Sequence, residues 1–256
     1  MPFLVLRPKI KKEIIKHAYF WDYLSILHAF RLAMQFIRHL FASSDHPKSL
    51  GAKFRKQRLA KFEKLFFRNF RLEKPIRILD VGGTDYFWKH SQIPQIPNLS
   101  ITLLNLHQEN PKHPHISSVI GDATHMPEFE DGSFDLVFSN SVIEHLYTFE
   151  NQEKMAKEIQ RVGKKFFIQT PNKYFPIEAH YAVPFAQYLP NRLLFFLLTK
   201  TPISRLKRWE PSQAEQYIKE IRLLNEKEMR ELFPGGKILK EKVGGLTKSL
   251  TAHNLR

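Results

Sequence analysis

Two hydrophobic periodicities divide the sequence near residue 75. Before it, apolar and aromatic residues recur every three or four positions, first over residues 14–41 and again over residues 48–70. That spacing gathers apolar side chains on one face of a helix. After it, apolar residues come in short runs bounded by turn residues, which is typical of strands. We therefore predict a basic helical extension over residues 1–74 and an α/β domain over residues 75–256.

The short apolar runs predict seven strands with helical stretches between several of them. One such stretch, residues 152–162, has an apolar face and ends at Gly163, a usual helix-capping residue. Strands that alternate with helices indicate a doubly wound, mostly parallel sheet. Only residues 244–246 separate the last two runs, which is too short for a crossover helix and predicts an antiparallel hairpin. The predicted strands are residues 76–81, 101–106, 118–120, 134–138, 165–170, 237–243 and 247–252.

The amino-acid composition limits the kinds of chemistry that the protein can perform. The 256 residues are 43% hydrophobic, enough for one α/β domain with an appendage, and they include no cysteine. Disulfides, thiolate metal sites and cysteine nucleophiles are therefore excluded. The N-terminus lacks the order of charges and apolar residues of a secretory signal, and no uninterrupted apolar run is long enough to span a bilayer. We expect a cytoplasmic protein.

The net charge of +15 is concentrated at the N-terminus, where residues 1–75 hold 17 Lys and Arg against 5 Asp and Glu. Such a block attracts nucleic acid, anionic lipid or an acidic glycan. Apolar helical stripes usually belong to a core, so we expect these helices to cap the following domain. Peripheral contact with the inner face of an anionic membrane is the alternative, and the same stripe could serve a dimer.

A carboxylate stands between a predicted strand and two glycines, in the segment ILDVGGTD at residues 78–85. Ligands of an open parallel sheet gather at the carboxyl ends of its strands. Gly82 and Gly83 let the backbone approach such a ligand closely. The segment lacks the phosphate-binding pattern of dinucleotide sites, and Asp80 would repel a phosphate but attract a cation. The turn suits a ligand with a cationic amino-acid end, such as S-adenosylmethionine.

Four segments, in this order and spacing, resemble the class I S-adenosylmethionine-dependent methyltransferases of the type 11 kind: ILDVGGTD, ITLLNL, GDATHMP and FDLVFSNSVIEHL. The resemblance covers residues 76–172, and residues 237–252 in topology. It implies a Rossmann-like sheet of seven strands, S-adenosylmethionine as cofactor, and methyl transfer. The family's glycine motif is D-x-G-x-G-x-G, and this chain departs from it because Thr84 stands where the second glycine belongs.

The resemblance also implies a cofactor site. Asn105 stands where relatives carry an acidic residue that accepts hydrogen bonds from the ribose, and an amide accepts more weakly than a carboxylate. Asp122 matches the residue that binds the adenine amino group, although an Asp there can also simply cap a turn. The implied cofactor-binding residues are Asp80, Gly82, Gly83, Thr84, Asn105, Leu106, Asp122, Ala123 and Asn140.

Methyl transfer is an in-line displacement, so the protein mainly positions the reactants and excludes water. A hydroxyl acceptor also needs a base, and His145, beside Glu144, is our candidate. These two are the predicted catalytic residues, although in relatives the same pair often only shapes the cofactor pocket. In the loop after the fifth predicted strand, Tyr174, Glu178 and His180 are candidates for orienting the substrate. We expect an insertion over residues 173–225 to cover the acceptor site.

The sequence thus predicts methyl transfer to a small-molecule, glycan or lipid-linked acceptor. One alternative is a catalytically silent interaction module, which Asn105 and the incomplete glycine motif would explain. Another is a nucleic-acid methyltransferase, which the basic N-terminus favours. The chain has no recognisable base-stacking module and no Asn/Asp-Pro-Pro-Tyr/Phe tetrad, so nucleic acid is disfavoured as a partner. The 12 histidines form no metal-binding motif, and we predict no metal site from the sequence.

Overall fold

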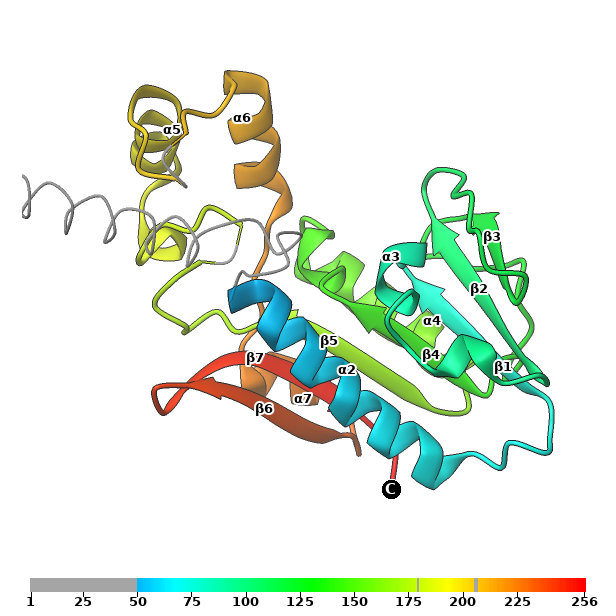
Figure 1. Cartoon of the computed structure of the whole chain (residues 1–256). Helices are drawn as coiled ribbons and strands as arrows, with labels where there is room; N and C mark the ends of the chain where they lie inside the picture. Colours follow the sequence, from blue (N-terminus) through cyan, green and yellow to red (C-terminus); the bar gives the residue numbers. More distant parts are fainter. Residues whose placement is uncertain (1–49, 179, 205–206) are drawn as a thin grey trace, which may run out of the picture. The chain divides into compact units, whose positions relative to one another are not determined.

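The computed structural model describes residues 50–178, 180–204 and 207–256 (Figure 1). The helices predicted over residues 14–41 lie outside the described residues. Lys56–Arg256 form one compact unit, whose architecture follows. In the portions of the chain that the structure describes, no helix has both the length and the hydropathy to cross a bilayer.

A seven-stranded sheet forms the centre of this unit, as predicted. Its strand order is β3-β2-β1-β4-β5-β7-β6. The first five strands are parallel, and β7 runs antiparallel to both β5 and β6. The antiparallel hairpin predicted at the C-terminus is confirmed. The strands are β1 (Ile76–Val81), β2 (Leu99–Asn105), β3 (Ile116–Ile120), β4 (Leu136–Asn140), β5 (Phe166–Pro171), β6 (Lys237–Val243) and β7 (Leu246–His253).

The strand order reverses at the centre of the sheet. The chain runs outward from β1 through β2 to β3 and then returns to β4 on the other side of β1. Asp80 lies in register with Leu103 of β2 and Phe138 of β4. In open parallel sheets, ligands bind where the strand order reverses in this way, beyond the carboxyl ends of the strands. The predicted site residues of β1, β2 and β4 all lie at this edge.

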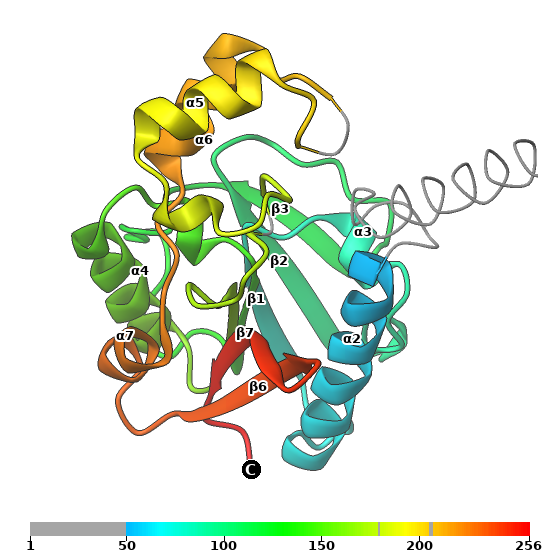
Figure 2. The same ribbon diagram turned by 90° about the vertical axis from the view of Figure 1, so that its left-hand side faces the viewer.

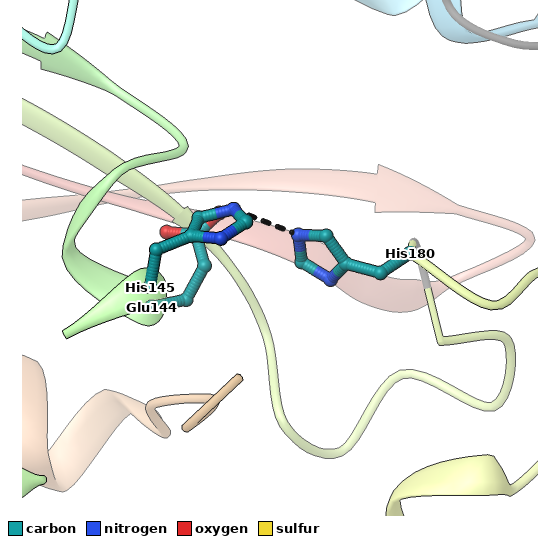
Figure 3. Close-up of side chains that lie close together, drawn as sticks. All are labelled: Glu144, His145 and His180. Atoms are coloured by element: carbon teal, nitrogen blue, oxygen red, sulfur yellow. Dashed lines mark hydrogen bonds between the residues drawn. The ribbon is translucent and has the colours of Figure 1, made fainter. Parts of the chain in front are cut away.

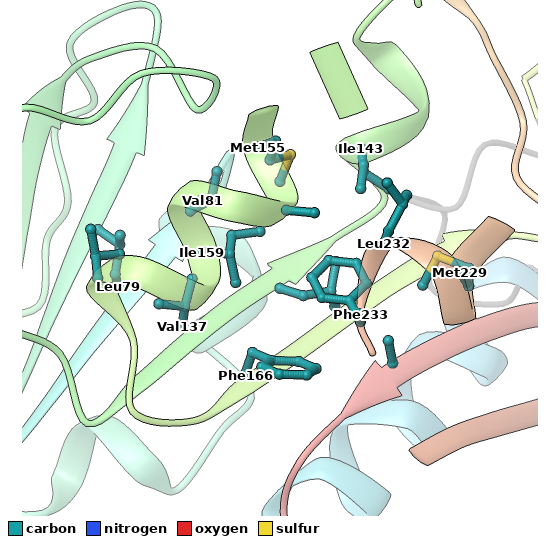
Figure 4. Packing of buried hydrophobic residues seen from close by; sticks show 14 of the residues in the cluster. Leu79, Val81, Val137, Ile143, Met155, Ile159, Phe166, Met229, Leu232 and Phe233 are labelled. Carbon is teal, nitrogen blue, oxygen red and sulfur yellow. The ribbon is translucent and has the colours of Figure 1, made fainter. Parts of the chain in front are cut away.

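Helices cover both faces of the sheet (Figure 2). On one face α4 (Phe149–Val162) and α7 (Glu226–Leu232) close an apolar core with the sheet, part of which Figure 4 shows. On the other face lie α3 (Asp85–Trp88) and α2 (Leu50–Asn69), the latter packing through its part from Lys56 onward. The buried residues that α2 contributes are Leu59, Phe62 and Phe66.

The aromatic contacts of α2 are extensive. The ring centroid of Phe62 lies 4.7 Å from that of Phe138 and 4.9 Å from that of Phe167, on two neighbouring strands. Burying a Phe side chain contributes about 2–3 kcal/mol. This packing is the capping role that we expected of the second amphipathic segment. The boundary predicted after residue 74 stays a prediction.

The segment between β5 and β6 contains the 3₁₀ turn η3 (Ala186–Tyr188) and the helices α5 (Asn191–Lys200) and α6 (Pro211–Glu220). Its apolar side chains form a small core of their own, separate from the two sheet cores. That core consists of Tyr181, Val183, Ala186, Leu194, Leu198 and Ala214. Two further 3₁₀ turns, η1 (Ile93–Gln95) and η2 (Ile143–His145), follow α3 and β4.

Gly163 caps α4 as predicted, but for a different physical reason. Its φ of −109° is not left-handed, so glycine is not needed there for its backbone freedom. A Cβ at this position would come within 2.5 Å of the Val137 side chain. Close packing of the helix end against β4 therefore requires the glycine.

Candidate active site

The turn after β1 encloses the Asp80 carboxylate. This side chain is only 1% exposed, and its Oδ2 accepts a hydrogen bond of 2.7 Å from the Trp88 indole N–H. A Cβ on Gly83 would lie 1.8 Å from the same oxygen, so only glycine fits at that position. Gly82 has a φ of +72°, in the left-handed region that favours glycine. The tight turn is therefore built around the carboxylate.

Asp80 is poised to receive a positive charge. Among the described residues its buried Oδ1 has no hydrogen-bond partner. Burial raises the pKa of Asp80 to about 7, against the opposing effect of the Trp88 hydrogen bond. A buried carboxylate is costly unless it is paired. A cationic group that reaches this turn would satisfy the oxygen and favour the ionised form.

Asn105 ties the end of β2 to the same turn. Its Nδ2 donates a hydrogen bond of 2.8 Å to the Gly83 carbonyl, and the backbone N–H of Gly82 donates to the Leu104 carbonyl at 2.8 Å. An ionised aspartate could not make the first bond because it has no donor. The amide at position 105 thus has a structural reason, and its Oδ1 remains available as an acceptor. Leu106 follows, with 69% of its surface exposed.

The turn after β3 carries Asp122, which is exposed. Its Oδ1 accepts hydrogen bonds from the backbone N–H of Thr124 at 2.8 Å and from the Thr124 hydroxyl at 2.9 Å. The turn-capping role considered from the sequence is therefore real. It occupies only one of the two carboxylate oxygens, so it leaves the predicted adenine contact open. Ala123 is half-buried beside it.

Arg58 reaches the carboxyl edge of the sheet from α2. Its Nη1 donates a hydrogen bond of 2.6 Å to the Asn140 side-chain oxygen, and its Nη2 lies 3.3 Å from Glu241 of β6. The sequence analysis missed Arg58, because 82 residues separate it from Asn140 and it was one of many basic residues on a helix. It holds Asn140 at the end of β4.

Beyond β4 and β5, three predicted residues come together: Glu144, His145 and His180, named below the two-histidine cluster (Figure 3). The Nε2 atoms of the two imidazoles lie 3.2 Å apart. One nitrogen or oxygen of each residue lies within 4.8 Å of the others. Glu144 and His145 come from η2, whereas His180 comes from the loop after β5.

Each imidazole of the two-histidine cluster is held by a carboxylate at its other nitrogen. His145 Nδ1 lies 2.5 Å from Glu220 Oε1, and His180 Nδ1 lies 2.6 Å from Glu178 Oε1. Glu178 is itself buried, and its Oε2 accepts from the backbone N–H groups of His180 and Tyr181, both at 2.7 Å. These bonds fix both the orientation and the tautomer of the rings.

Glu144 is completely buried beneath these rings. Its Oε2 accepts a hydrogen bond of 3.0 Å from the Thr170 hydroxyl, whereas Oε1 has no partner in the described portions of the chain. Burial raises the pKa of this carboxyl, and the charges of His180 and His145 oppose that effect. Like Asp80, Glu144 has one satisfied and one unsatisfied oxygen.

The backbone around the cluster is unusual. Four non-glycine residues of the described ranges have a positive φ: Ser141, Tyr147, Ala182 and Phe185. The first two bracket the segment that carries Glu144 and His145, and the other two follow His180. Backbone strain of this kind costs about 1–3 kcal/mol per residue and gathers at functional sites.

The remaining candidate, Tyr174, does not join this group. It is 62% exposed and lines a hollow of about 310 Å³ with Asn172, Thr247 and residues 225–227. Glu178 and Tyr181 instead line a second cavity of about 220 Å³, beside the helices of the insertion. Glu220, which the sequence analysis did not consider, is the last residue of α6. Nothing local to position 220 indicates its role.

A family model described as a methyltransferase domain matches residues 97–166, which run from β2 into β5. Residues 97–166 therefore match a methyltransferase domain, within a sheet whose order, β3-β2-β1-β4-β5-β7-β6, is that of the class I S-adenosylmethionine-dependent methyltransferase fold. The cofactor of such enzymes is S-adenosylmethionine. The residues present fit it, because the unpartnered Asp80 Oδ1 suits its ammonium group and Asn105 keeps an acceptor for a ribose hydroxyl.

Several solved structures are similar to the chain. A protein from Rhodobacter sphaeroides described among zinc-dependent alcohol dehydrogenases is 13% identical, with a TM-score of 0.45 over 70% of this chain and 83% of its own. A Methanosarcina mazei S-adenosylmethionine-dependent methyltransferase is 12% identical, with a TM-score of 0.44 over 75% and 97%. Phosphoethanolamine N-methyltransferase 2 of Haemonchus contortus is 17% identical, with a TM-score of 0.45 over 71% and 38%. No curated protein sequence matches the chain.

Proposed function

We propose that this methyltransferase transfers a methyl group to a hydroxyl of a small-molecule, glycan or lipid-linked acceptor. The observation that carries the proposal is the two-histidine cluster, with its carboxylate partners, at the carboxyl edge of β4 and β5. A hydroxyl must lose its proton during methylation, whereas a neutral amine can attack before it loses one. The two-histidine cluster can accept such a proton, and it therefore favours a hydroxyl over an amine as the methyl acceptor.

The glycine turn supports the donor half of the reaction. S-adenosylmethionine supplies a methyl group on a sulfonium, which leaves as a neutral thioether. Asp80 would pair with the ammonium group of its amino-acid end, and Asn105 would accept from the ribose. Leu106, whose side chain is largely exposed, offers an apolar surface for the adenine beside Asp122 and Ala123.

The insertion supports the acceptor half. The end of α6 contacts η2, because Glu220 pairs with His145 and the Tyr217 ring lies 6.4 Å from the same imidazole. The backbone N–H of Tyr147 also donates to the Glu220 carbonyl at 3.1 Å. These contacts support a covered acceptor site, in which water would be excluded and the acceptor held for in-line attack.

The two alternatives have less support. The silent-module interpretation rested on Asn105 and on the incomplete glycine motif. The amide of Asn105 has a structural partner in the Gly83 carbonyl, and Gly82 and Gly83 form the tight turn around Asp80. The nucleic-acid interpretation rested on the charge of residues 1–75, of which the structure describes only the last third. A small acceptor is instead supported by the cavity of about 220 Å³ that Glu178 and the insertion line, which has room for part of a small molecule or a sugar unit.

Calorimetric titration of the purified chain with S-adenosylmethionine and S-adenosylhomocysteine is the first test. We expect micromolar binding that the Asp80→Asn variant loses. Turnover is then assayed with panels of hydroxyl and amine acceptors, using radiolabelled methyl donor. A folded wild type that binds neither compound would overturn the proposal and favour the interaction module. Methylation confined to amines would overturn the choice of oxygen.

A further inference from the structure

The two imidazoles of the two-histidine cluster face each other through their Nε2 atoms. A neutral imidazole has one N–H donor and one acceptor nitrogen. Because the Nδ1 atoms face the carboxylates of Glu220 and Glu178, both must carry the hydrogen. Both Nε2 atoms are then acceptors, and they face each other at 3.2 Å. Two opposed lone pairs repel unless a proton or a metal cation lies between or beside them.

The spacing of the cluster fits a metal ion as well as a shared proton. Zinc binds histidine nitrogen at about 2.0–2.1 Å with tetrahedral angles, which separates two such nitrogens by roughly 3.3 Å. The observed separation of 3.2 Å agrees with that value. A carboxylate oxygen of Glu144 lies within 4.8 Å of a ring nitrogen of each histidine. The Oε1 atom of Glu144 is buried and has no partner among the described residues, so it lacks the ligand that a buried carboxylate oxygen requires.

We propose that Glu144, His145 and His180 bind one divalent transition-metal ion. Two imidazole nitrogens and one carboxylate oxygen suit zinc, cobalt, manganese or iron(II) better than magnesium or calcium, which prefer oxygen ligands alone. The site needs no cysteine, in keeping with the composition of the chain. The sequence could not reveal it because 35 residues separate the two histidines.

The surroundings are those of a metal centre. Histidine ligands usually donate their second N–H to a carboxylate, which fixes the ring and strengthens the ligand. Glu220 and Glu178 occupy these positions here. The buried carboxylate of Glu144, which has one unpartnered oxygen among the described residues, also brings negative charge next to the two imidazole rings. A dication compensates that charge, which the protein would otherwise hold unpaired in a region of low dielectric.

Three protein ligands leave at least one coordination position for water or for an oxygen of the acceptor. An acceptor hydroxyl bound there would lose its proton more easily, because the cation stabilises the alkoxide. This role rests on the proposed function, whereas the site itself does not. In this arrangement the two histidines act as ligands, and the metal takes over the task first assigned to His145 as a base.

Cobalt(II) is the probe for the site, because its visible absorption reports both coordination and ligand type. The full chain is stripped with a chelator, dialysed and titrated with Co²⁺ in the absence of S-adenosylmethionine. We expect one ion per chain, a spectrum of low coordination number, and displacement by one equivalent of Zn²⁺. Thermal unfolding of the stripped chain verifies that it remains folded.

Variants test which residues bind the ion. Glu144→Gln, His145→Asn and His180→Asn should each weaken Co²⁺ binding by more than about 100-fold, since even the partners of metal ligands contribute 10–100-fold. Glu220→Gln should weaken it by about 10-fold or more. The matched control is His125→Asn, which removes an exposed histidine and should change nothing.

The outcomes separate the two proposals. A folded wild type that gives no cobalt spectrum overturns the metal site and leaves a shared proton between the histidines. Binding that the three ligand variants do not weaken overturns it as well. Calorimetry with S-adenosylmethionine is run on the same samples. If cobalt binds as expected but the cofactor does not, the proposed function fails and the metal site stands.

Discussion

Asp80 and Glu144 are two buried carboxylates at the same edge of one sheet, and they differ in what surrounds them. Each has one oxygen bonded to a neutral donor, Trp88 or Thr170, and one oxygen with no partner in the described structure. Around Asp80 the neighbours are neutral, whereas Glu144 lies beneath two histidines. Asp80 therefore gains a positively charged partner only when a ligand binds, whereas Glu144 belongs to a cluster whose side chains are already arranged to hold a cation.

The largest expected effect comes from the Glu144 side of this comparison. His145→Asn should lower kcat by about 100- to 10,000-fold, the usual contribution of proton removal in catalysis. The affinity for S-adenosylmethionine should change by less than about 2-fold, because His145 does not contact the glycine turn. Single-turnover kinetics and calorimetry check the two parts. An equal loss of affinity would mean that the cluster shapes the cofactor pocket.

Asp80→Asn should do the reverse. We expect the affinity for S-adenosylmethionine to fall by about 30-fold or more, because loss of one partner of a buried charge pair costs about 2–5 kcal/mol. The substitution keeps the shape of the side chain, so the turn should persist. Glu63→Gln, which changes a carboxylate on α2 that bonds Ser91, is the matched control. Calorimetry that finds equal affinities for wild type and Asp80→Asn would contradict the assignment.

The same substitution should stabilise the protein without ligand. The pKa of Asp80 is raised to about 7 in the folded state, so the stability that its protonated form contributes is complete below about pH 4 and is lost as the pH rises through 7. Asparagine stays neutral throughout. Above pH 7 the variant should therefore be more stable, by at most about 4 kcal/mol. Thermal unfolding at about pH 5 and about pH 8 should show an advantage that grows with pH, and a constant difference would refute this account.

Cofactor binding should depend on pH for the same reason. The ammonium group binds the ionised carboxylate, so below pH 7 Asp80 must first release its proton. The affinity of the wild type should fall by up to about tenfold per pH unit as the pH drops from 7. Calorimetry in buffers of different ionisation enthalpy would count the released proton. The slope should vanish in Asp80→Asn, and its persistence there would point to another group.

The smallest effect concerns the link between β2 and the glycine turn. Asn105→Asp removes the donor to the Gly83 carbonyl and should lower the free energy of unfolding by about 1 kcal/mol. Gln108→Glu makes the same amide-to-acid change at an exposed position nearby and should have little effect. Urea denaturation measures both. Equal stabilities for wild type and Asn105→Asp would show that the bond contributes nothing.

The sequence predicted the turn after β1 better than the two-histidine cluster. The bounds of β1 and β6 agree with the apolar runs, and Asp80 meets its turn and Trp88 within eight residues. The local sequence pattern was sufficient for this prediction because the residues involved lie in one strand and in the turn that follows it. The hairpin of β6 and β7 was equally predictable, since residues 244–246 leave no room for a crossover.

The two-histidine cluster is formed by contacts between residues that are far apart in the sequence. Glu220 meets His145 from 75 residues away, and His180 meets it from 35. Both contacts depend on how the insertion packs, and the hydrophobic periodicity of the sequence does not reveal that packing. Individual candidate residues could still be predicted, because polar groups at the ends of parallel strands share one edge of the sheet. The pairing of Glu220 with His145 could not be predicted from the sequence.

The separate core of the insertion bears on how such enzymes can diversify. Residues from Tyr181 to Ala214 pack on one another rather than into the sheet, yet this segment and its flanks carry Glu178, His180 and Glu220. The core that the sheet shares with α4 and α7 contains none of the described residues from Tyr181 to Ala214. A descendant of this chain could therefore exchange the whole segment as a cassette, keeping its methyl donor while acquiring a different acceptor.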